Sequence, residues 1–168
     1  SVSHKIKALP EIKDIVSRHQ ENGKTVIFTN GCFDFLHVGH IRYLEAARAL
    51  GDILVLGLNG DKSVRAIKGP GRPLMDQQER AEIMAALECV DYIVVFDDLR
   101  ADRLLAELKP DVHAKGTDYT QETVPERDTV LSYGGTIAIV GDSKDHSTRD
   151  YLRRIREKTH VTPRATGR

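Results

Sequence analysis

Short apolar runs alternate with amphipathic stretches along the chain, and each kind of stretch predicts a different element. Apolar runs bounded by turn residues predict buried strands at 24–30, 53–59, 91–96, 112–114 and 136–140. Helical periodicity predicts helices at 10–22, 39–50, 76–88, 99–108, 125–132 and 147–158. Residues 1–23 thus supply a leading helix, and residues 159–168 show no pattern, so we expect a mobile tail there.

This alternation predicts an α/β fold, with an open parallel sheet of about five strands and helices on both faces. The continuous apolar character of 53–59 is typical of a strand buried on both faces of such a sheet. The chain has 168 residues and no internal repeat or linker, so we expect a single domain over 1–168. Ligands of open parallel sheets bind beyond the carboxyl ends of the strands, and there we expect the site.

The stretch TNGCFDFLHVGH at 29–40 follows the first predicted strand and opens a helix. Gly31 permits a turn or a close backbone approach, and Gly39 leaves the backbone bare between two histidines. His37 and His40 stand three residues apart, a spacing that places both on one helix face. A helix N-terminus with free backbone N–H groups favours an anion, so this stretch predicts a phosphate site.

A metal site is the alternative interpretation of a histidine pair. Zinc-binding helices usually space their histidines four apart around a glutamate, and that glutamate is missing here. The sequence therefore favours phosphate, with no protein-held metal.

The run Gly31-x-Phe33-Asp34-x-x-His37-x-Gly39-His40 resembles the HxGH signature of the nucleotidyltransferases related to class I tRNA synthetases, within their cytidylyltransferase-like group. The resemblance extends over about residues 24–156 and implies a Rossmann-like fold. It also implies that a phosphorylated substrate attacks the α-phosphorus of a nucleoside triphosphate. His37 and His40 are then catalytic, and the nucleotide lies against Asn30, Gly31, Cys32, Phe33, Asp34 and Gly39.

Further motifs follow the later strands and take their roles from the same resemblance. Lys68, in the loop KGPGRP, is expected to neutralise charge in the transition state, with Arg72 as a second phosphate contact. Without the resemblance, this loop is typical of a solvated turn. Asn59 and Asp61 are expected near the substrate, although Asn-Gly-Asp also suits a turn and helix cap, and Gly60 replaces a serine of the relatives.

The segment HAKGTDY at 113–119 resembles the Val-Lys-Gly-Gly-Asp-Tyr motif of bacterial heptose-1-phosphate adenylyltransferases. Lys115 and Gly116 are expected at the nucleotide and Asp118 at the substrate, while Thr117 departs from the second glycine of that motif. At the last helix, Ser147 and Thr148 are expected to hold the leaving phosphates. Serine or threonine here also suits a simple cap, and Arg149 departs from the relatives' pattern. Backbone near Val140 is expected to select the base.

The composition limits the kinds of binding partner that we expect. Lysine plus arginine balance aspartate plus glutamate at 25 each, so no global charge field indicates a nucleic acid or a membrane. No apolar run approaches the ~18 residues needed to span a bilayer, and no secretory signal opens the chain. Cys32 and Cys89 form no CxxC motif and suit a reducing compartment, so we expect a cytoplasmic protein. The resemblance further suggests a homodimer.

The expected activity joins ATP and a sugar 1-phosphate, such as heptose 1-phosphate, to give an ADP-sugar and pyrophosphate. Mg²⁺ is expected to bind through the nucleotide phosphates rather than through protein ligands. A CTP-dependent cytidylyltransferase acting on glycerol 3-phosphate, or on a related alcohol phosphate, is the alternative enzyme. A nucleotide-binding module without turnover is the third possibility, and it is disfavoured because the histidines, the lysine loop and the helix-cap hydroxyls are all present.

Overall fold

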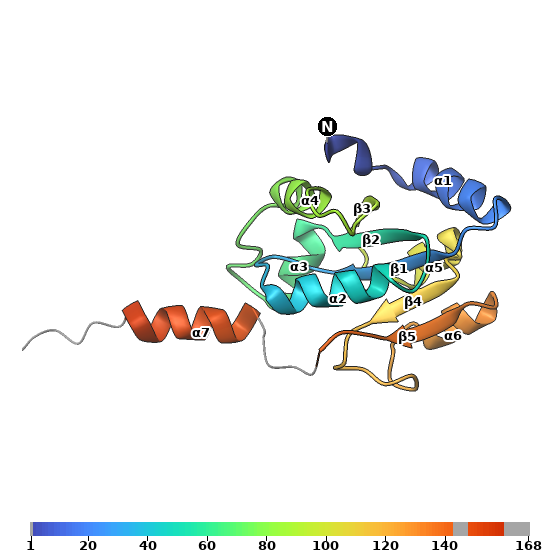
Figure 1. Cartoon of the computed structure of the whole chain (residues 1–168). Helices are drawn as coiled ribbons and strands as arrows, with labels where there is room; N and C mark the ends of the chain where they lie inside the picture. The colour runs from blue at the N-terminus through green and yellow to red at the C-terminus, as the bar shows by residue number, and fades with distance from the viewer. Residues whose placement is uncertain (1, 143–147, 160–168) are drawn as a thin grey trace, which may run out of the picture.

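The computed structural model describes residues 2–142 and 148–159. A single sheet of five strands, all parallel, forms its centre in the order β3-β2-β1-β4-β5 (Figure 1). The strands are β1 (Val26–Gly31), β2 (Ile53–Asn59), β3 (Tyr92–Phe96), β4 (Val112–Lys115) and β5 (Thr136–Ile139). The predicted fold class is confirmed, and each strand lies within two residues of its predicted bounds.

Helices connect successive strands. They are α1 (Leu9–Glu21), α2 (Val38–Arg48), α3 (Asp61–Lys68), α4 (Gln77–Ala85), α5 (Asp102–Leu108), α6 (Arg127–Ser132) and α7 (Thr148–Thr159), with a short 3-10 helix, η1, at Val2–Lys5. Asp76 caps α4 by accepting the backbone N–H of Glu79 at 2.8 Å, as the sequence predicts. The sequence did not predict η1, and it predicted only a helical stretch of undefined bounds where α3 lies.

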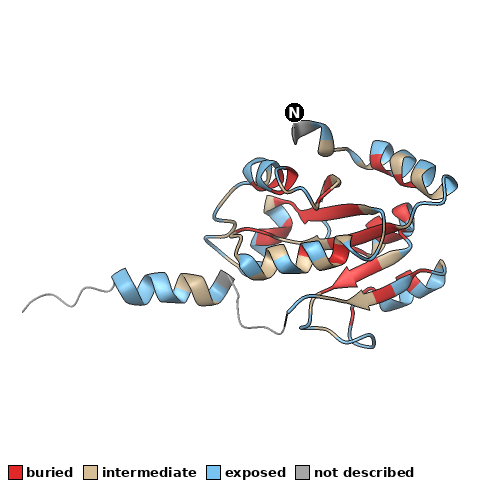
Figure 2. Ribbon diagram, viewed as in Figure 1, coloured by how far each residue is buried: buried red, intermediate tan, exposed pale blue. Residues whose placement is uncertain are grey.

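Two hydrophobic layers sandwich the sheet because successive strand residues point to opposite faces. On one face Phe28 and Val55 pack with residues of α1, α5 and α6. On the other, Ile27 and Leu56 pack with residues of α2 and α4. The strands at the centre of the sheet are accordingly buried almost throughout (Figure 2). This burial on both faces explains why the strand at 53–59 is continuously apolar.

The last helix, α7, begins near the N-terminus of α2. The ring centroids of Tyr151 and His37 lie 5.4 Å apart, and that of Tyr151 lies 6.2 Å from the Phe35 ring. From there α7 extends away from the sheet (Figure 1). The helix therefore meets the rest of the molecule beside the histidine motif. The expected tail at 159–168 lies outside the described residues apart from Thr159, which ends α7.

Candidate functional site

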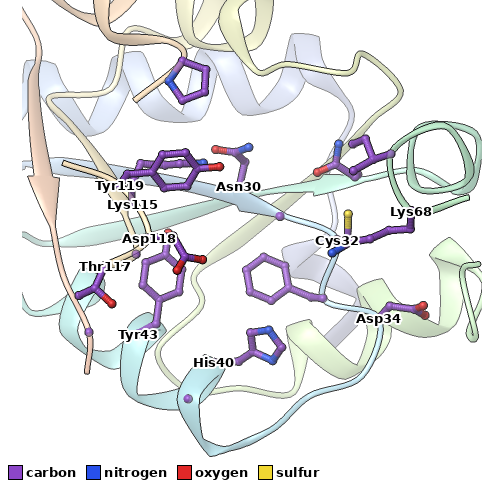
Figure 3. Close-up of a pocket in the computed structure, with 18 of the residues that line it drawn as sticks. Asn30, Cys32, Asp34, His40, Tyr43, Lys68, Lys115, Thr117, Asp118 and Tyr119 are labelled. Carbon is purple, nitrogen blue, oxygen red and sulfur yellow. The ribbon is translucent and has the colours of Figure 1, made fainter. Parts of the chain in front are cut away.

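A cavity of about 640 Å³ opens at the carboxyl ends of β1, β2, β4 and β5 (Figure 3). This is the edge where ligands of open parallel sheets bind. Fifteen of the predicted site residues line it: Asn30, Gly31, Cys32, Phe33, Asp34, His37, Gly39, His40, Asn59, Lys68, Arg72, Lys115, Gly116, Asp118 and Val140. Segments far apart in the sequence thus meet at one place, as expected.

Three predicted residues do not belong to this described lining. Asp61, at the start of α3, is absent from the lining, and its carboxylate accepts a hydrogen bond from Arg80 at 2.9 Å. Its contact with substrate therefore stays a prediction without geometric support. Ser147 lies outside the described residues, and of Thr148 only the backbone is described, as the first residue of α7. Arg149, one residue later, lines the cavity.

The two histidines of the motif cap the helix that they open. His37 is the N-cap of α2, and its Nδ1 accepts the backbone N–H of Gly39 at 3.1 Å. Nδ1 of His40 accepts the backbone N–H of His37 at 3.3 Å, which completes a capping box. A ring nitrogen that accepts a hydrogen bond bears no proton, so each neutral ring has its proton on Nε2. Each histidine therefore offers an Nε2–H donor.

His40 sits in a setting that keeps its ring neutral. Burial, the neighbouring His37 and the positive charge of Lys68 lower the pKa of His40 to about 4. The His37 ring stacks on it with centroids 3.9 Å apart, and the edge of Phe33 meets it at 5.4 Å. At neutral pH the His40 ring is consequently uncharged and acts as a hydrogen-bond donor rather than as a charge.

The turn between β1 and α2 depends on a tight contact between Gly31 and Phe33. Phe33 has φ +45°, in the left-handed region that side chains rarely adopt. A Cβ on Gly31 would lie 2.7 Å from the Phe33 ring, closer than such atoms can approach. In this structure the glycine makes room for the aromatic ring that packs on His40, a reason that the sequence alone did not indicate.

Asp34 holds the basic loop, KGPGRP at 68–73 with Leu74 and Met75 after it, against the end of β1. Its buried carboxylate accepts hydrogen bonds from Nε of Arg72 at 2.7 Å and from the backbone N–H groups of Leu74 and Met75 at 2.7 and 2.9 Å. Burial acts to raise the pKa of Asp34, but the backbone and Arg72 hydrogen bonds outweigh it and lower the pKa overall. The Arg72 bond holds that side chain beside Asp34 at the cavity, and the predicted nucleotide contact of Asp34 itself stays a prediction.

Arg80 of α4 is a structural residue of the site that sequence reasoning missed. Its guanidinium is fully buried and donates to the carbonyls of Cys32 at 2.8 Å and Asn59 at 2.6 Å. It also donates to the Met75 carbonyl at 3.0 Å and to the carboxylate of Asp61 at 2.9 Å. One side chain thus joins the carboxyl ends of β1 and β2 to α3 and the basic loop.

A second buried polar group lies at the end of β4. His113 is fully buried, and its Nε2 lies 3.1 Å from Oδ1 of Asn30, on the neighbouring strand. Burial, with a smaller effect of Lys115, lowers the pKa of His113 to about 3. A neutral His113 therefore donates to Asn30 Oδ1, which leaves the amide N–H groups of Asn30 for other partners. Nδ1 of His113 has no hydrogen-bond partner among the described residues.

Hydrogen bonds from α2 and from Thr117, the residue that departs from the relatives' motif, hold the cavity wall at the ends of β4 and β5. Arg42 of α2 pairs with the carboxylate of Asp142 at 2.8 Å, and Thr117 donates to the Asp142 carbonyl at 2.8 Å. The Tyr43 hydroxyl donates to the carbonyl of Ala114 at 2.9 Å. These bonds connect α2 to the ends of β4 and β5 beside Val140.

The donor set does not suit a protein-held metal ion. Within residues 2–142 and 148–159, no group of three or more histidine, cysteine, aspartate or glutamate side chains is arranged to hold one. Nor is any helix in the described part of the chain long and apolar enough to cross a membrane.

Comparison with known proteins identifies the family. The model of the cytidylyltransferase-like family matches residues 28–157. The chain belongs to that family. Its members are nucleotidyltransferases, and the chain is therefore an enzyme of this class.

Curated relatives have the same residue as this chain at about half of the aligned positions. The Bifunctional protein HldE of Syntrophotalea carbinolica is 51% identical over 154 residues, and that of Geobacter metallireducens is 50% identical over 151. These matches cover 92% and 90% of this chain but only 31% of either relative. The chain thus spans about a third of their length.

Solved structures agree with the fold. The lipopolysaccharide core biosynthesis protein from Thermoplasma volcanium matches with a TM-score of 0.62 and 29% identity, over 74% of this chain and 100% of that one. Pantothenate synthetase from Thermus thermophilus has a TM-score of 0.60 over 92% of this chain and 70% of that one. At 17% identity, it shows the fold alone.

Proposed function

We propose that this nucleotidyltransferase joins ATP to a sugar 1-phosphate, heptose 1-phosphate being the first candidate, and releases pyrophosphate. The observation that supports it best is the histidine pair. Two imidazole rings, fixed by the backbone of α2, offer Nε2–H donors at a helix N-terminus beside a cavity lined with basic side chains. This is an arrangement for binding and stabilising phosphate oxygens.

The reaction needs no protein nucleophile. An oxygen of the ionised sugar phosphate attacks the α-phosphorus of ATP, a new P–O bond forms, and the bond to the bridging β-phosphate oxygen breaks. Pyrophosphate leaves with the electron pair. Because the attacking oxygen is already ionised, the protein contributes positioning and charge stabilisation rather than proton removal.

The described residues divide this work. His37 and His40 donate to the phosphate oxygens that gain charge. Lys68 lines the same cavity as His40, and its ammonium neutralises charge on the same oxygens. Arg149 lines the cavity at the start of α7, where Ser147 and Thr148 are expected to hold the leaving pyrophosphate.

Magnesium fits this site through the nucleotide rather than through the protein. Asp34, which lies in the motif, is occupied by Arg72 and two backbone N–H groups. When bound to the triphosphate, Mg²⁺ neutralises part of its negative charge.

The substrate assignment rests on relatives. HAKGTDY resembles the heptose-1-phosphate adenylyltransferases, the curated relatives are HldE proteins, and one structural relative is named for lipopolysaccharide core biosynthesis. Use of CTP with an alcohol phosphate is the alternative. We expect pyrophosphate release to be fastest with ATP when the four common nucleotides are compared on heptose 1-phosphate and glycerol 3-phosphate. CTP with glycerol 3-phosphate as the preferred pair would reverse the assignment.

The histidines are best tested with asparagine. The side-chain oxygen of asparagine mimics Nδ1, so His37→Asn and His40→Asn keep an acceptor for the backbone while removing the Nε2–H donor. We expect each variant to lower turnover by about a hundredfold or more. His19→Asn, in α1 and outside the cavity lining, is the matched control. Unchanged pyrophosphate release in both motif variants would exclude the proposed role.

A module without turnover predicts a different result. Such a protein would bind ATP, measured by calorimetry, and release no pyrophosphate with any member of a sugar-phosphate panel.

A further inference from the structure

Two buried charges lie in the cavity apart from the histidine motif. Lys115, at the end of β4, is 7% exposed, and Glu126, directly before α6, is 3% exposed; both line the cavity. Figure 3 shows Lys115 beside Asn30 and Tyr119, across the cavity from His40. Lys115 therefore faces a different part of any ligand from the part that meets His40.

In the described protein no direct ion pair neutralises either charge, although burial lowers the pKa of Lys115 and the charge of Glu126 acts against that shift. Among residues 2–142 and 148–159, Lys115 and Glu126 form no ion pair, and the Lys115 ammonium rests 4.8 Å from the centroid of the Tyr119 ring. Oε1 of Glu126 accepts the backbone N–H of Ala101 at 3.4 Å, while Oε2 is buried with no partner in the described residues. A buried carboxylate oxygen without a donor is costly, which points to a partner supplied by a ligand.

The wall that presents Glu126 is well supported. Arg100, before α5, donates to the Pro125 carbonyl, and the Thr129 hydroxyl of α6 donates to the Asp102 carboxylate of α5 at 2.7 Å. These contacts tie the loop before α5 to the loop before α6. Glu126 is thus held in place independently of the histidine end of the cavity.

We propose that Lys115 and Glu126 form the subsite for the acceptor, in which the ammonium binds the acceptor's phosphate and the carboxylate accepts a hydrogen bond from the hydroxyl on the neighbouring carbon. The proposal rests on the proposed function and names the feature of the substrate that the site recognises. A cation beside a carboxylate is complementary to a phosphate beside a hydroxyl, the pattern of a sugar 1-phosphate with a C2 hydroxyl.

The geometry of the reaction supports placing the acceptor on the side of the cavity where Lys115 and Glu126 lie. In phosphoryl-type transfer the attacking and leaving oxygens lie roughly in line on opposite sides of the phosphorus. Pyrophosphate is assigned to the end formed by α2 and α7, so the acceptor belongs at the opposite end. Lys115 is thus assigned to the acceptor in place of the nucleotide contact that the resemblance implies, because the Lys115 ammonium covers the nearby face of Tyr119 and leaves that face less open to a nucleobase.

Calorimetry with two compounds tests the roles of Lys115 and Glu126 separately. Wild-type protein is titrated with heptose 1-phosphate and with its 2-deoxy analogue. We expect the parent compound to bind about tenfold more tightly or better, because the deoxy compound leaves Glu126 unpaired. Glu126→Gln should remove most of that preference, whereas Lys115→Met should weaken the binding of both compounds to a similar extent.

Glu122→Gln, an exposed carboxylate of the same loop, is the matched control and should keep the preference. ATP affinity should change by less than about twofold in Glu126→Gln; an equal loss of ATP and sugar phosphate affinity would mean a structural role and overturn the proposal. A preserved hydroxyl preference in Glu126→Gln, or no wild-type binding of heptose 1-phosphate, would overturn it as well. Wild-type binding with the expected preference but no pyrophosphate release would instead refute the proposed reaction and leave the subsite standing.

Discussion

Arg80 is the best single test of how the cavity is built. Its guanidinium donates four hydrogen bonds, three to carbonyls and one to the Asp61 carboxylate, from a fully buried position. Arg80→Lys keeps the charge but replaces a planar fork by a single ammonium, which cannot reach acceptors on four segments at once. The substitution should therefore lose at least two of these bonds.

Hydrogen bonds to charged groups contribute about 1.5–3 kcal/mol each, so the loss of two costs about 3 kcal/mol or more. For a chain of this size each kcal/mol shifts Tm by about 2–4 °C, which gives an expected decrease of about 6–12 °C. Thermal unfolding followed by circular dichroism measures it. Arg65→Lys, at an exposed position of α3, is the matched control and should stay within about 1 °C of wild type.

Activity supplies the second measurement for Arg80→Lys. Because Arg80 binds the carbonyls of Cys32 and Asn59, which both line the cavity, we expect pyrophosphate release to fall even at temperatures where the variant is folded. A Tm within 2 °C of wild type, together with full activity, would contradict the role given to the guanidinium.

Three further outcomes are expected. Asp34→Asn should raise the KM for ATP about tenfold, because a neutral amide holds the loop of Arg72 less firmly than the carboxylate does; an unchanged KM in steady-state assays would contradict this. Lys68→Ala should lower kcat about a hundredfold or more, whereas Lys62→Ala, exposed on the same helix and outside the cavity lining, should not; equal effects would exclude a direct role of Lys68. Folding lowers the pKa of His113 to about 3, so between pH ~6.5 and about 3 the unfolded chain binds more protons than the folded one. In that range the free energy of unfolding should therefore decrease as the pH is lowered. His113→Asn should flatten this dependence in urea titrations at pH 7.5 and 5, and an equal pH dependence in both proteins would refute the assignment.

Much of the fold could be predicted because it depends on local patterns. The apolar run at 53–59 and the alternation of strands with helices specify a parallel sheet, and the sheet in turn places its carboxyl ends together. That geometry is why fifteen predicted residues from separate segments line one cavity. The single-domain boundary, the homodimer and the cytoplasmic location stay predictions.

The remaining features depend on contacts that no local pattern contains. Arg80 stands four residues before Met84, on the buried face of α4, and a basic residue on an apolar face was the available signal. Glu126 gave no signal, because its burial arises from the packing of α5 against α6. The capping by His37 and His40 was also not predicted, since a histidine nitrogen rarely takes the place of a capping hydroxyl or carboxylate.

The capping bonds of the two histidines have a consequence for isotope effects. A ring whose Nδ1 accepts a backbone N–H and whose Nε2 already bears a proton has no lone pair with which to remove one. Neither imidazole can then serve as a general base, and the proposed reaction moves no proton at its slow step. Turnover in heavy water should accordingly proceed at nearly the rate in ordinary water.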